Sequence, residues 1–324
     1  MSGPLPPVAL SCGEPAGIGP EIAARARAAL GPALPFFWIG DPRHLPPGTE
    51  ITEITSPQEA LSAQGLPVLV HEIPGALTLG TPNPDHAEGV ISAIARGVEL
   101  VQSGAASALC TAPIHKKALQ DGAGFAYPGH TEYLAALCGV KQVVMMLASD
   151  QLRVVPATIH IPLKDVPATL TAAGLRETLQ ITHAGLIRDF GIEAPRIVVA
   201  GLNPHAGEGG KMGLEETQMI GPVVDELRRE GMDVRGPMSA DTMFHAAARA
   251  GYDAAVCMYH DQALIPIKTL DFDRGVNVTL GLPIVRTSPD HGTALDIAGQ
   301  ARANPTSLIE ALRMAARMGA ARRA

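Results

Sequence analysis

Short apolar runs alternate with longer amphipathic segments along most of the chain. The apolar runs, which are candidate β-strands, cover residues 8–11, 36–39, 68–70, 108–110, 143–147, 152–159, 197–200 and 254–258. The amphipathic segments carry Ala, Leu, Arg and Glu at helical spacing, and they cover residues 21–30, 86–103, 175–190, 215–230 and 305–318. This alternation predicts an α/β fold of α/β/α type, with a mainly parallel sheet between layers of helices.

The last amphipathic segment also has a helix start signal. Asn304 precedes it, and the side-chain oxygen of this residue can accept hydrogen bonds from the free N–H groups of a first turn. Pro305 lacks an N–H group and therefore loses nothing at the first helical position. The sequence thus predicts a final helix that begins at Pro305.

The chain has 324 residues, of which 46% are hydrophobic, and this is enough to bury one substantial core or two modest ones. Because no polar linker separates two halves, we expect one functional unit with two lobes. The first lobe is expected to contain residues 1–125 and 290–324, and the second residues 126–289. Ligands of such sheets bind beyond the carboxyl ends of the strands, so we expect the active site in the cleft between the lobes.

The charge balance and the cysteine pattern exclude several classes of protein. Lys and Arg number 25 against 32 Asp and Glu, and no long basic run occurs, which excludes an electrostatic nucleic-acid surface. The N-terminal MSGPLPPVAL lacks a basic region, and no apolar window approaches about 18 residues, so we expect neither signal peptide nor membrane span. The 4 cysteines lie far apart, which excludes a disulfide scaffold. We therefore expect a cytoplasmic protein.

The segment SCGEPAGIGPE, residues 11–21, joins the first apolar run to a helix start and can direct free N–H groups at a phosphate. Gly17 and Gly19 begin like a dinucleotide-binding fingerprint, and Asp41 follows the next strand. Ile22, however, stands where the third glycine belongs. A tight strand-to-helix turn explains the glycines equally well, so this segment alone identifies no ligand.

Three histidines stand just beyond candidate strands: His160 after VVPATI, His205 in GLNPHAGE and His260 in MYHDQ. Their spacing carries no local metal signature, and taken singly each is more typical of a hydrogen-bonded surface or packing residue. The carboxyl ends of parallel strands, however, share one edge of a sheet, where three imidazoles suit Zn²⁺ with an open position for substrate. Asp241 and Asp261 are candidate acceptors that orient imidazoles, although turn or capping roles fit them equally well.

Two further segments contain candidate anion ligands. In PGHTEYL, His130 and Thr131 can donate hydrogen bonds to an anion. Taken by itself, Thr131 is more typical of a helix cap. Between His260 and Gly292, three polar residues are bordered by apolar or turn segments: Lys268, Asn277 and Arg286. They are candidates to bind a phosphate or carboxylate, with ordinary salt bridges as the alternative.

A series of motifs spans residues 13–294 in this order: GEPAGIGPE, TAPIHKKAL, GHTEYLA, TIHIPL, GLNPHAGEGG, SADTMF, MYHDQALIPIK and VNVTLGLPIVRTSPDHGTA. Together they resemble the 4-hydroxythreonine-4-phosphate dehydrogenase family of vitamin B6 biosynthesis, whose fold is similar to that of the isocitrate and isopropylmalate dehydrogenases. The resemblance implies a homodimer with shared active sites at its interface. It also implies that NAD or NADP oxidises 4-phosphooxy-L-threonine at the C3 hydroxyl, with decarboxylation to 3-amino-2-oxopropyl phosphate.

The resemblance also implies roles for individual residues. One divalent ion per active site, Zn, Mg, Co or Mn, is expected to be bound by His160, His205 and His260, drawn from both subunits. The expected substrate contacts are His130, Thr131, Lys268, Asn277 and Arg286, and Asp241 and Asp261 are expected to maintain the site. Glu14 departs from the family pattern, in which aspartate is common at this position. The cofactor contacts are not located by the motifs.

Other functions share much of this pattern. The nearest alternative is a paralogous dehydrogenase of the same family that acts on D-threonate or D-erythronate 4-phosphate, since metal, phosphate and hydride chemistry are common to both. An acyl-phosphate transferase with a related two-lobed layout is a second alternative, against which the three histidines argue. A binding protein without catalysis is the third.

Overall fold

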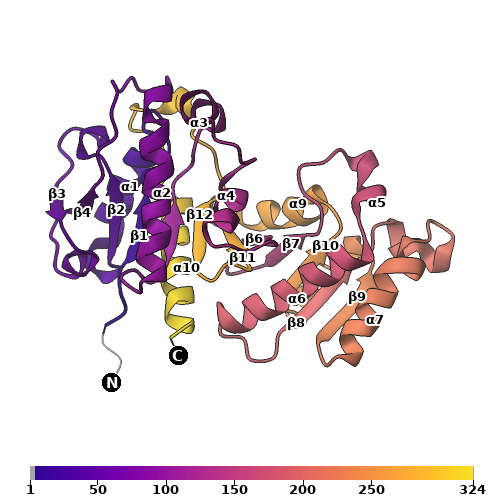
Figure 1. Ribbon diagram of the computed structural model, residues 1–324. Helices are drawn as coiled ribbons and strands as arrows, with labels where there is room; N and C mark the ends of the chain where they lie inside the picture. The colour runs from indigo at the N-terminus through magenta and orange to yellow at the C-terminus, as the bar shows by residue number, and fades with distance from the viewer. Residues whose placement is uncertain (1–3, 324) are drawn as a thin grey trace. The chain divides into compact units, whose positions relative to one another are not determined.

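The computed structural model describes residues 4–323, which form two compact units (Figure 1). Unit 1 contains the chain up to Val143 and again from Leu282 onward, and unit 2 is Val144–Gly281. Each unit has its own set of strands and its own covering helices.

The limits of the units differ from the expected boundaries at 125/126 and 289/290. The segment before Val144 contains α4 (His130–Leu137), which packs against α2 (Ala87–Gln102). The segment after Gly281 contains β12 (Arg286–Pro289), which pairs with β5 (Leu109–Thr111). Because the partners of both segments lie in unit 1, the two segments belong to unit 1 as well.

The sheet of unit 1 has the strand order β3-β4-β2-β1-β5-β12, and its neighbouring strands are parallel. The strands not yet given are β1 (Val8–Ser11), β2 (Phe36–Gly40), β3 (Ile51–Ile54) and β4 (Leu66–Val70). Every residue of β1 and β2 is buried, which explains why these strands appear in the sequence as continuous apolar runs.

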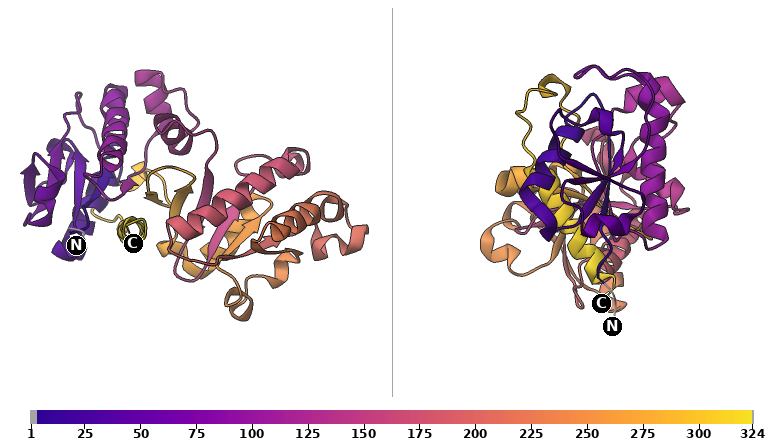
Figure 2. Two further views of the ribbon diagram at one scale, coloured as in Figure 1. Left: turned by 60° about the horizontal axis from the view of Figure 1, so that its bottom comes forward. Right: turned by 90° about the vertical axis from the view of Figure 1, so that its left-hand side faces the viewer.

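Helices cover both faces of this sheet, with α2 on one face and α1 (Gly19–Leu30) and α10 (Thr306–Ala321) on the other (Figure 2). A further helix, α3 (Lys116–Ala123), packs against α2. The last helix begins one residue later than expected. Its Thr306 N–H donates to Asn304 Oδ1 at 3.0 Å, so the expected cap is present while Pro305 precedes the first turn.

The sheet of unit 2 has the strand order β11-β6-β7-β10-β8-β9. Its strands are β6 (Val144–Ala148), β7 (Arg153–Pro156), β8 (Arg196–Ala200), β9 (Asp233–Met238), β10 (Ala254–Cys257) and β11 (Val276–Leu280). The neighbours from β7 to β9 are parallel, whereas β6 is antiparallel to both β11 and β7. The expected α/β fold with mainly parallel strands is confirmed.

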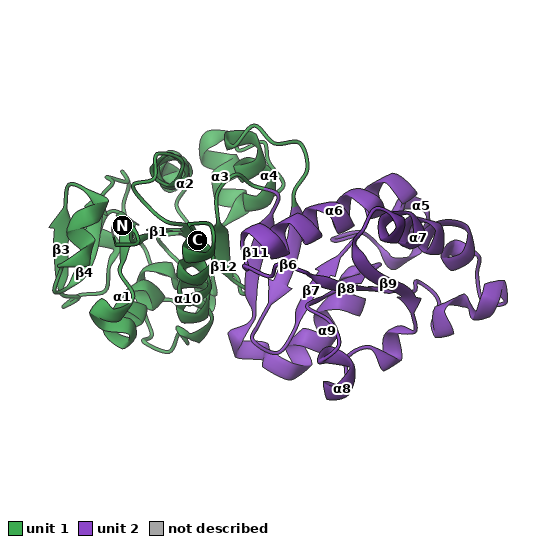
Figure 3. Cartoon of the chain, turned by 90° about the horizontal axis from the view of Figure 1, so that it is seen from below, with its two compact units in different colours: residues 1–143, 282–324 green, residues 144–281 purple. Residues whose placement is uncertain are grey.

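The helices of unit 2 also cover both faces of their sheet (Figure 3). On one face lie α6 (Ala172–Arg188) and α7 (Gly221–Arg229), on the other lies α9 (His260–Asp271), and the short helices are α5 (Val166–Thr169) and α8 (Ala246–Arg249). The segment expected as one helix at 215–230 is divided, because a π-helical turn, Glu216–Ile220, precedes α7.

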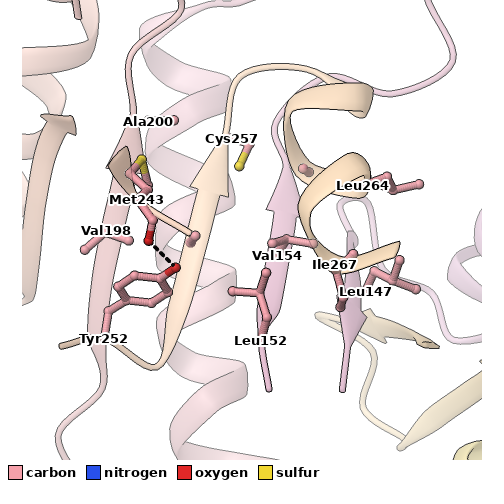
Figure 4. Packing of buried hydrophobic residues seen from close by; sticks show 12 residues of the cluster. Leu147, Leu152, Val154, Val198, Ala200, Met243, Tyr252, Cys257, Leu264 and Ile267 are labelled. Carbon is pink, nitrogen blue, oxygen red and sulfur yellow. Dashed lines mark hydrogen bonds between the residues drawn. The ribbon is translucent and has the colours of Figure 1, made fainter. Parts of the chain in front are cut away.

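The hydrophobic core beneath α9 fixes this helix on the sheet. Leu264 and Ile267 of α9 pack with Val154 of β7 in one buried cluster (Figure 4). At the edge of the same cluster the Tyr252 hydroxyl donates to the Met243 carbonyl oxygen at 3.0 Å. The first turn of α9, which begins with His260, is therefore held at the carboxyl end of β10.

Two further expectations can be compared with the described residues. None of the helices between residues 4 and 323 combines the length and apolar character that a membrane span requires. All cysteines are free thiols. Burial raises the pKa of both Cys12 and Cys110 to about 12, so these side chains stay protonated at neutral pH.

Unit 1 contains a buried pair of histidines that the sequence did not single out. His44, which follows β2, lies with its ring centroid 5.2 Å from that of His86. Only 5% of the His44 surface is exposed, and its Nδ1 has no hydrogen-bond partner in the described part of the chain. Burial lowers the pKa of His44 to about 4, against the opposing charge of Asp41.

This burial predicts a loss of stability in mild acid. The unfolded chain takes up a proton at His44 near pH 6.5, but the folded protein does so only near pH 4. The free energy of unfolding therefore falls between these values, by up to about 3 kcal/mol from this group. His44→Phe removes the titrating group and keeps a ring. Urea unfolding of both proteins from pH 7 to pH 4 should show a shallower decline for the variant, and parallel curves would contradict the assignment.

Candidate active site

Backbone atoms of neighbouring loops pack directly against the glycines of the turn SCGEPAGIGPE. Gly13 has φ +69°, and a Cβ at this position would lie 2.5 Å from the Pro113 carbonyl oxygen. A Cβ at Gly17 would lie 2.8 Å from the Thr293 carbonyl oxygen. The glycines thus permit close packing of three loops, and the tight-turn interpretation explains them. Asp41, the candidate ribose ligand, is 2% exposed and its carboxylate is already paired with Arg43.

A cationic cluster in unit 1 includes Arg286, the first residue of β12, which reaches Thr111, the last residue of β5. Arg286 is 3% exposed, and its Nη2 donates to Thr111 Oγ1 at 2.8 Å. Burial lowers the pKa of Arg286 to about 10, although the nearby Glu132 carboxylate offsets part of this effect. The guanidinium is therefore a cation that has lost most of its water, and an anion would stabilise it strongly.

His130 belongs to the same cluster. It is the first residue of α4, and its Nε2 is buried without a hydrogen-bond partner among residues 4–323. Burial and the charges of Arg286 and Lys116 lower the pKa of His130 well below its usual value. Thr131 follows at the half-buried second position of the helix, where backbone N–H groups are free for an anion. Together these groups form a site suited to phosphate.

Lys116 is a residue that the sequence analysis missed. It begins α3, directly after the strand-end segment TAPIH, and it lies close enough to influence His130 electrostatically. Its exposed ammonium group adds positive charge to the cluster. The available signal was its place beyond β5, since a basic residue just after a buried parallel strand is well placed to reach a ligand.

In unit 2 the structure brings His160 and His260 together. Their ring centroids lie 5.7 Å apart, and both side chains line a cavity of about 260 Å³, together with Thr158, Tyr259 and Asp261. Asp261 Oδ1 lies 2.7 Å from His260 Nδ1. This contact favours the tautomer in which Nδ1 carries the proton and the lone pair of Nε2 is available to a metal ion.

His205 lies apart from this pair. It is exposed, and it is absent from the residues that line the His160–His260 cavity. Within the described part of one chain, no three His, Cys, Asp or Glu side chains are arranged to hold a metal ion. One chain therefore supplies two adjacent imidazoles, which are suitable ligands for Zn²⁺ or Co²⁺, and a complete set of three needs a further contribution.

Backbone strain marks two of the three histidines. His160 has φ +47° and His205 has φ +52°, in the left-handed region that few residues other than glycine adopt. The left-handed stretch at His205 continues to Gly209. Such conformations cost free energy and concentrate at functional sites, so they support a functional role for both loops.

The remaining candidates of unit 2 have separate surroundings. Asp241 accepts a hydrogen bond from Ser239 Oγ at 2.5 Å, in an exposed turn. Lys268 lies on α9, with its Nζ 5.7 Å from the centroid of the Phe272 ring. Asn277 lies on β11, and its Oδ1 is buried without a hydrogen-bond partner in the part of the chain that the structure describes. An amide oxygen left in this state is available to a ligand donor.

Residues 35–315 match the model of the family described as pyridoxal phosphate biosynthetic protein PdxA. The chain belongs to the PdxA family. It is 66% identical over 323 residues to the 4-hydroxythreonine-4-phosphate dehydrogenase of Roseobacter denitrificans, with 99% of each chain covered. The crystal structure of the Klebsiella pneumoniae enzyme of that name has a TM-score of 0.90 and 37% identity, covering 97% of this chain and 99% of that one. The family expected from the motifs is confirmed.

The cationic cluster predicts specific stabilisation by inorganic phosphate. At constant ionic strength, phosphate should raise the Tm of the wild-type protein, because it binds only the folded cluster. Arg286→Lys should lose most of this increase, since an ammonium group cannot replace the planar fork. Arg43→Lys, at a side chain 67% exposed in the same unit, is the control and should keep it. Equal increases in all three proteins would show that the cluster binds no phosphate.

Proposed function

We propose that this member of the PdxA family oxidises 4-phosphooxy-L-threonine at its C3 hydroxyl with NAD or NADP and decarboxylates the product to 3-amino-2-oxopropyl phosphate, for pyridoxine 5'-phosphate biosynthesis. The observation that carries the proposal is the adjacent pair of His160 and His260 in a cavity beyond the strand ends. Relatives that bear the name of this activity match over 99% of the chain.

The proposed metal site uses the histidines. Two imidazoles side by side fit a divalent ion such as Zn, Co, Mn or Mg, and we propose that two protomers of a homodimer together supply His160, His205 and His260. The exposure of His205 supports this arrangement, because an exposed ligand is free to meet a second chain. When bound, the ion supplies a Lewis acid, which lowers the pKa of a coordinated hydroxyl and withdraws charge during the loss of a carboxylate.

The residues of the chain then bind and orient the substrate. His130, Thr131 and Arg286 hold its phosphate, and the desolvated guanidinium of Arg286 makes this attachment strong. Lys268 and Asn277 are proposed as further substrate contacts. Binding energy gained at the phosphate holds the distant carbon in the geometry that hydride transfer requires.

Acidic residues support the imidazoles in this proposal. Asp261 accepts from His260 Nδ1–H and keeps the ring in one orientation, with Nε2 left for the metal. Because Asp261 is 70% exposed, this contact serves orientation more than affinity. Asp241 is proposed to maintain the turn in which it binds Ser239, at the beginning of the segment SADTMF.

A metal-dependent turnover assay tests substrate, cofactor and metal together. Purified protein with 4-phosphooxy-L-threonine should reduce NAD or NADP, lose at least about 100-fold of its rate after chelation, and recover it when a divalent ion is added back. D-Erythronate 4-phosphate, in which hydroxyl replaces the amino group, should be turned over more slowly.

His205→Ala is the matched variant in this assay and should be inactive in every condition while remaining folded. Full activity in metal-free buffer would contradict the metal role. Faster turnover of D-erythronate 4-phosphate than of 4-phosphooxy-L-threonine would show that the sugar-acid phosphate is the preferred substrate.

A further inference from the structure

The three strand ends that precede the histidines are joined by hydrogen bonds that do not belong to the strands themselves. Beyond β7, the Ala157 N–H donates to the Cys257 carbonyl oxygen at 2.7 Å. Next, the hydroxyl of Thr158, which is 7% exposed, donates to the Met258 carbonyl oxygen at 2.7 Å. His160 and His260 each follow two residues later, so the backbones that carry them leave the sheet as one connected edge.

Gln262 extends this connection from β10 to β8. Its side-chain Oε1 accepts from the Met258 N–H at 2.7 Å, and its Nε2 donates to the Gly201 carbonyl oxygen at 2.7 Å. Met258 follows the last residue of β10 and Gly201 follows the last residue of β8. Both backbone groups lie at buried residues beyond the strands, where each needs a partner, and one amide side chain serves both.

The loop that Gln262 anchors at Gly201 leads to His205. Farther along this loop, the carboxylate of Glu216, which is 3% exposed, accepts from the Asn203 N–H at 2.7 Å and from Asn203 Nδ2 at 3.0 Å. A Cβ at Gly207 would lie 2.6 Å from Glu216 Oε2, so the left-handed backbone wraps closely around this carboxylate. The backbone that leads to His205 is therefore held at two points, by Gln262 at Gly201 and by Glu216 at Asn203.

We propose that Gln262 is a positioning residue for the metal site, because it fixes the backbone segments from which His205 and His260 project. The inference rests on the proposed metal role of these histidines. The side chain of Gln262 hydrogen-bonds to two backbone groups, and within residues 4–323 it makes no hydrogen bond to either imidazole. Its effect on metal binding is therefore indirect, through the strand ends.

The two bonds require both halves of an amide. A carboxylate at position 262 keeps the acceptor for Met258 N–H but sets a negative oxygen against the Gly201 carbonyl oxygen. A methionine has similar length and neither a strong donor nor a strong acceptor. Gln262→Glu therefore breaks the connection to β8 alone, and Gln262→Met breaks both. Gln151→Met is the control, since Gln151 Nε2 also donates to a backbone carbonyl in unit 2, that of Leu270 at 3.3 Å.

The test is the affinity of the protein for Co²⁺, measured by calorimetric titration of the metal-free protein, with kcat at saturating Co²⁺ as the second readout. Gln262→Met should bind Co²⁺ about 10- to 100-fold more weakly and show a lower kcat, and Gln262→Glu should show a smaller loss of both. Excess Co²⁺ should restore occupancy but only part of kcat, because the ligands remain misplaced. The Gln151→Met control should match the wild type.

Several results would overturn the inference. Wild-type affinity and kcat in Gln262→Met would do so, and so would equal losses in Gln151→Met, which would indicate general destabilisation. A wild-type protein that binds no Co²⁺ would remove both this inference and the proposed metal site. A wild-type protein that binds Co²⁺ without oxidising 4-phosphooxy-L-threonine would contradict only the proposed substrate, and the titrations of the variants would still decide the role of Gln262.

Discussion

The candidate site of unit 2 depends on the parallel pairing of β10 with β7 on one side and β8 on the other. Pro156 pairs with Cys257 and Val199 with Val256, so the three strands end at the same edge of the sheet. Residues remote in the sequence then begin their loops as neighbours. The buried core under α9 holds this edge in place, and everything proposed for the histidines follows from it.

The site of unit 1 rests on a different constraint, the burial of charge. Arg286 and His130 are held where water cannot stabilise a positive charge, which lowers the pKa of both groups. A negatively charged ligand at this place would stabilise both groups in their charged forms, which is the basis of the proposed phosphate site. The proposed phosphate contact would replace part of the solvation that these side chains lose on burial.

The sequence predicted the central strands well because strands buried on both faces appear as continuous apolar runs. It missed β3, where Ile51 is 37% exposed at the edge of the sheet, and β9, whose residues include Asp233 and Arg235. It also missed β11 and β12, whose sequences VNVTL and RTSP contain polar residues and therefore form no continuous apolar run. Polar edge strands lack the apolar signal on which such a prediction depends.

The site was predicted in outline and not in detail. Strand-end placement correctly indicated that His160 and His260 lie near each other, since that follows from parallel pairing alone. The left-handed backbone at His205, by contrast, is maintained by Glu216 and by the glycines after His205, and this depends on tertiary contacts. The bridging role of Gln262 was likewise absent from the motif analysis, because it arises only when β8 and β10 are adjacent.

The central claim is that His160, His205 and His260 ligate one divalent ion, although one chain brings only two of them together. The most direct measurement is X-ray absorption at the zinc edge of the zinc-loaded wild-type protein, which counts imidazole ligands. The account predicts three imidazole nitrogens at about 2.0–2.1 Å, falling to two in His205→Ala. A shell with fewer than three imidazoles in the wild type, or one unchanged in the variant, would contradict it.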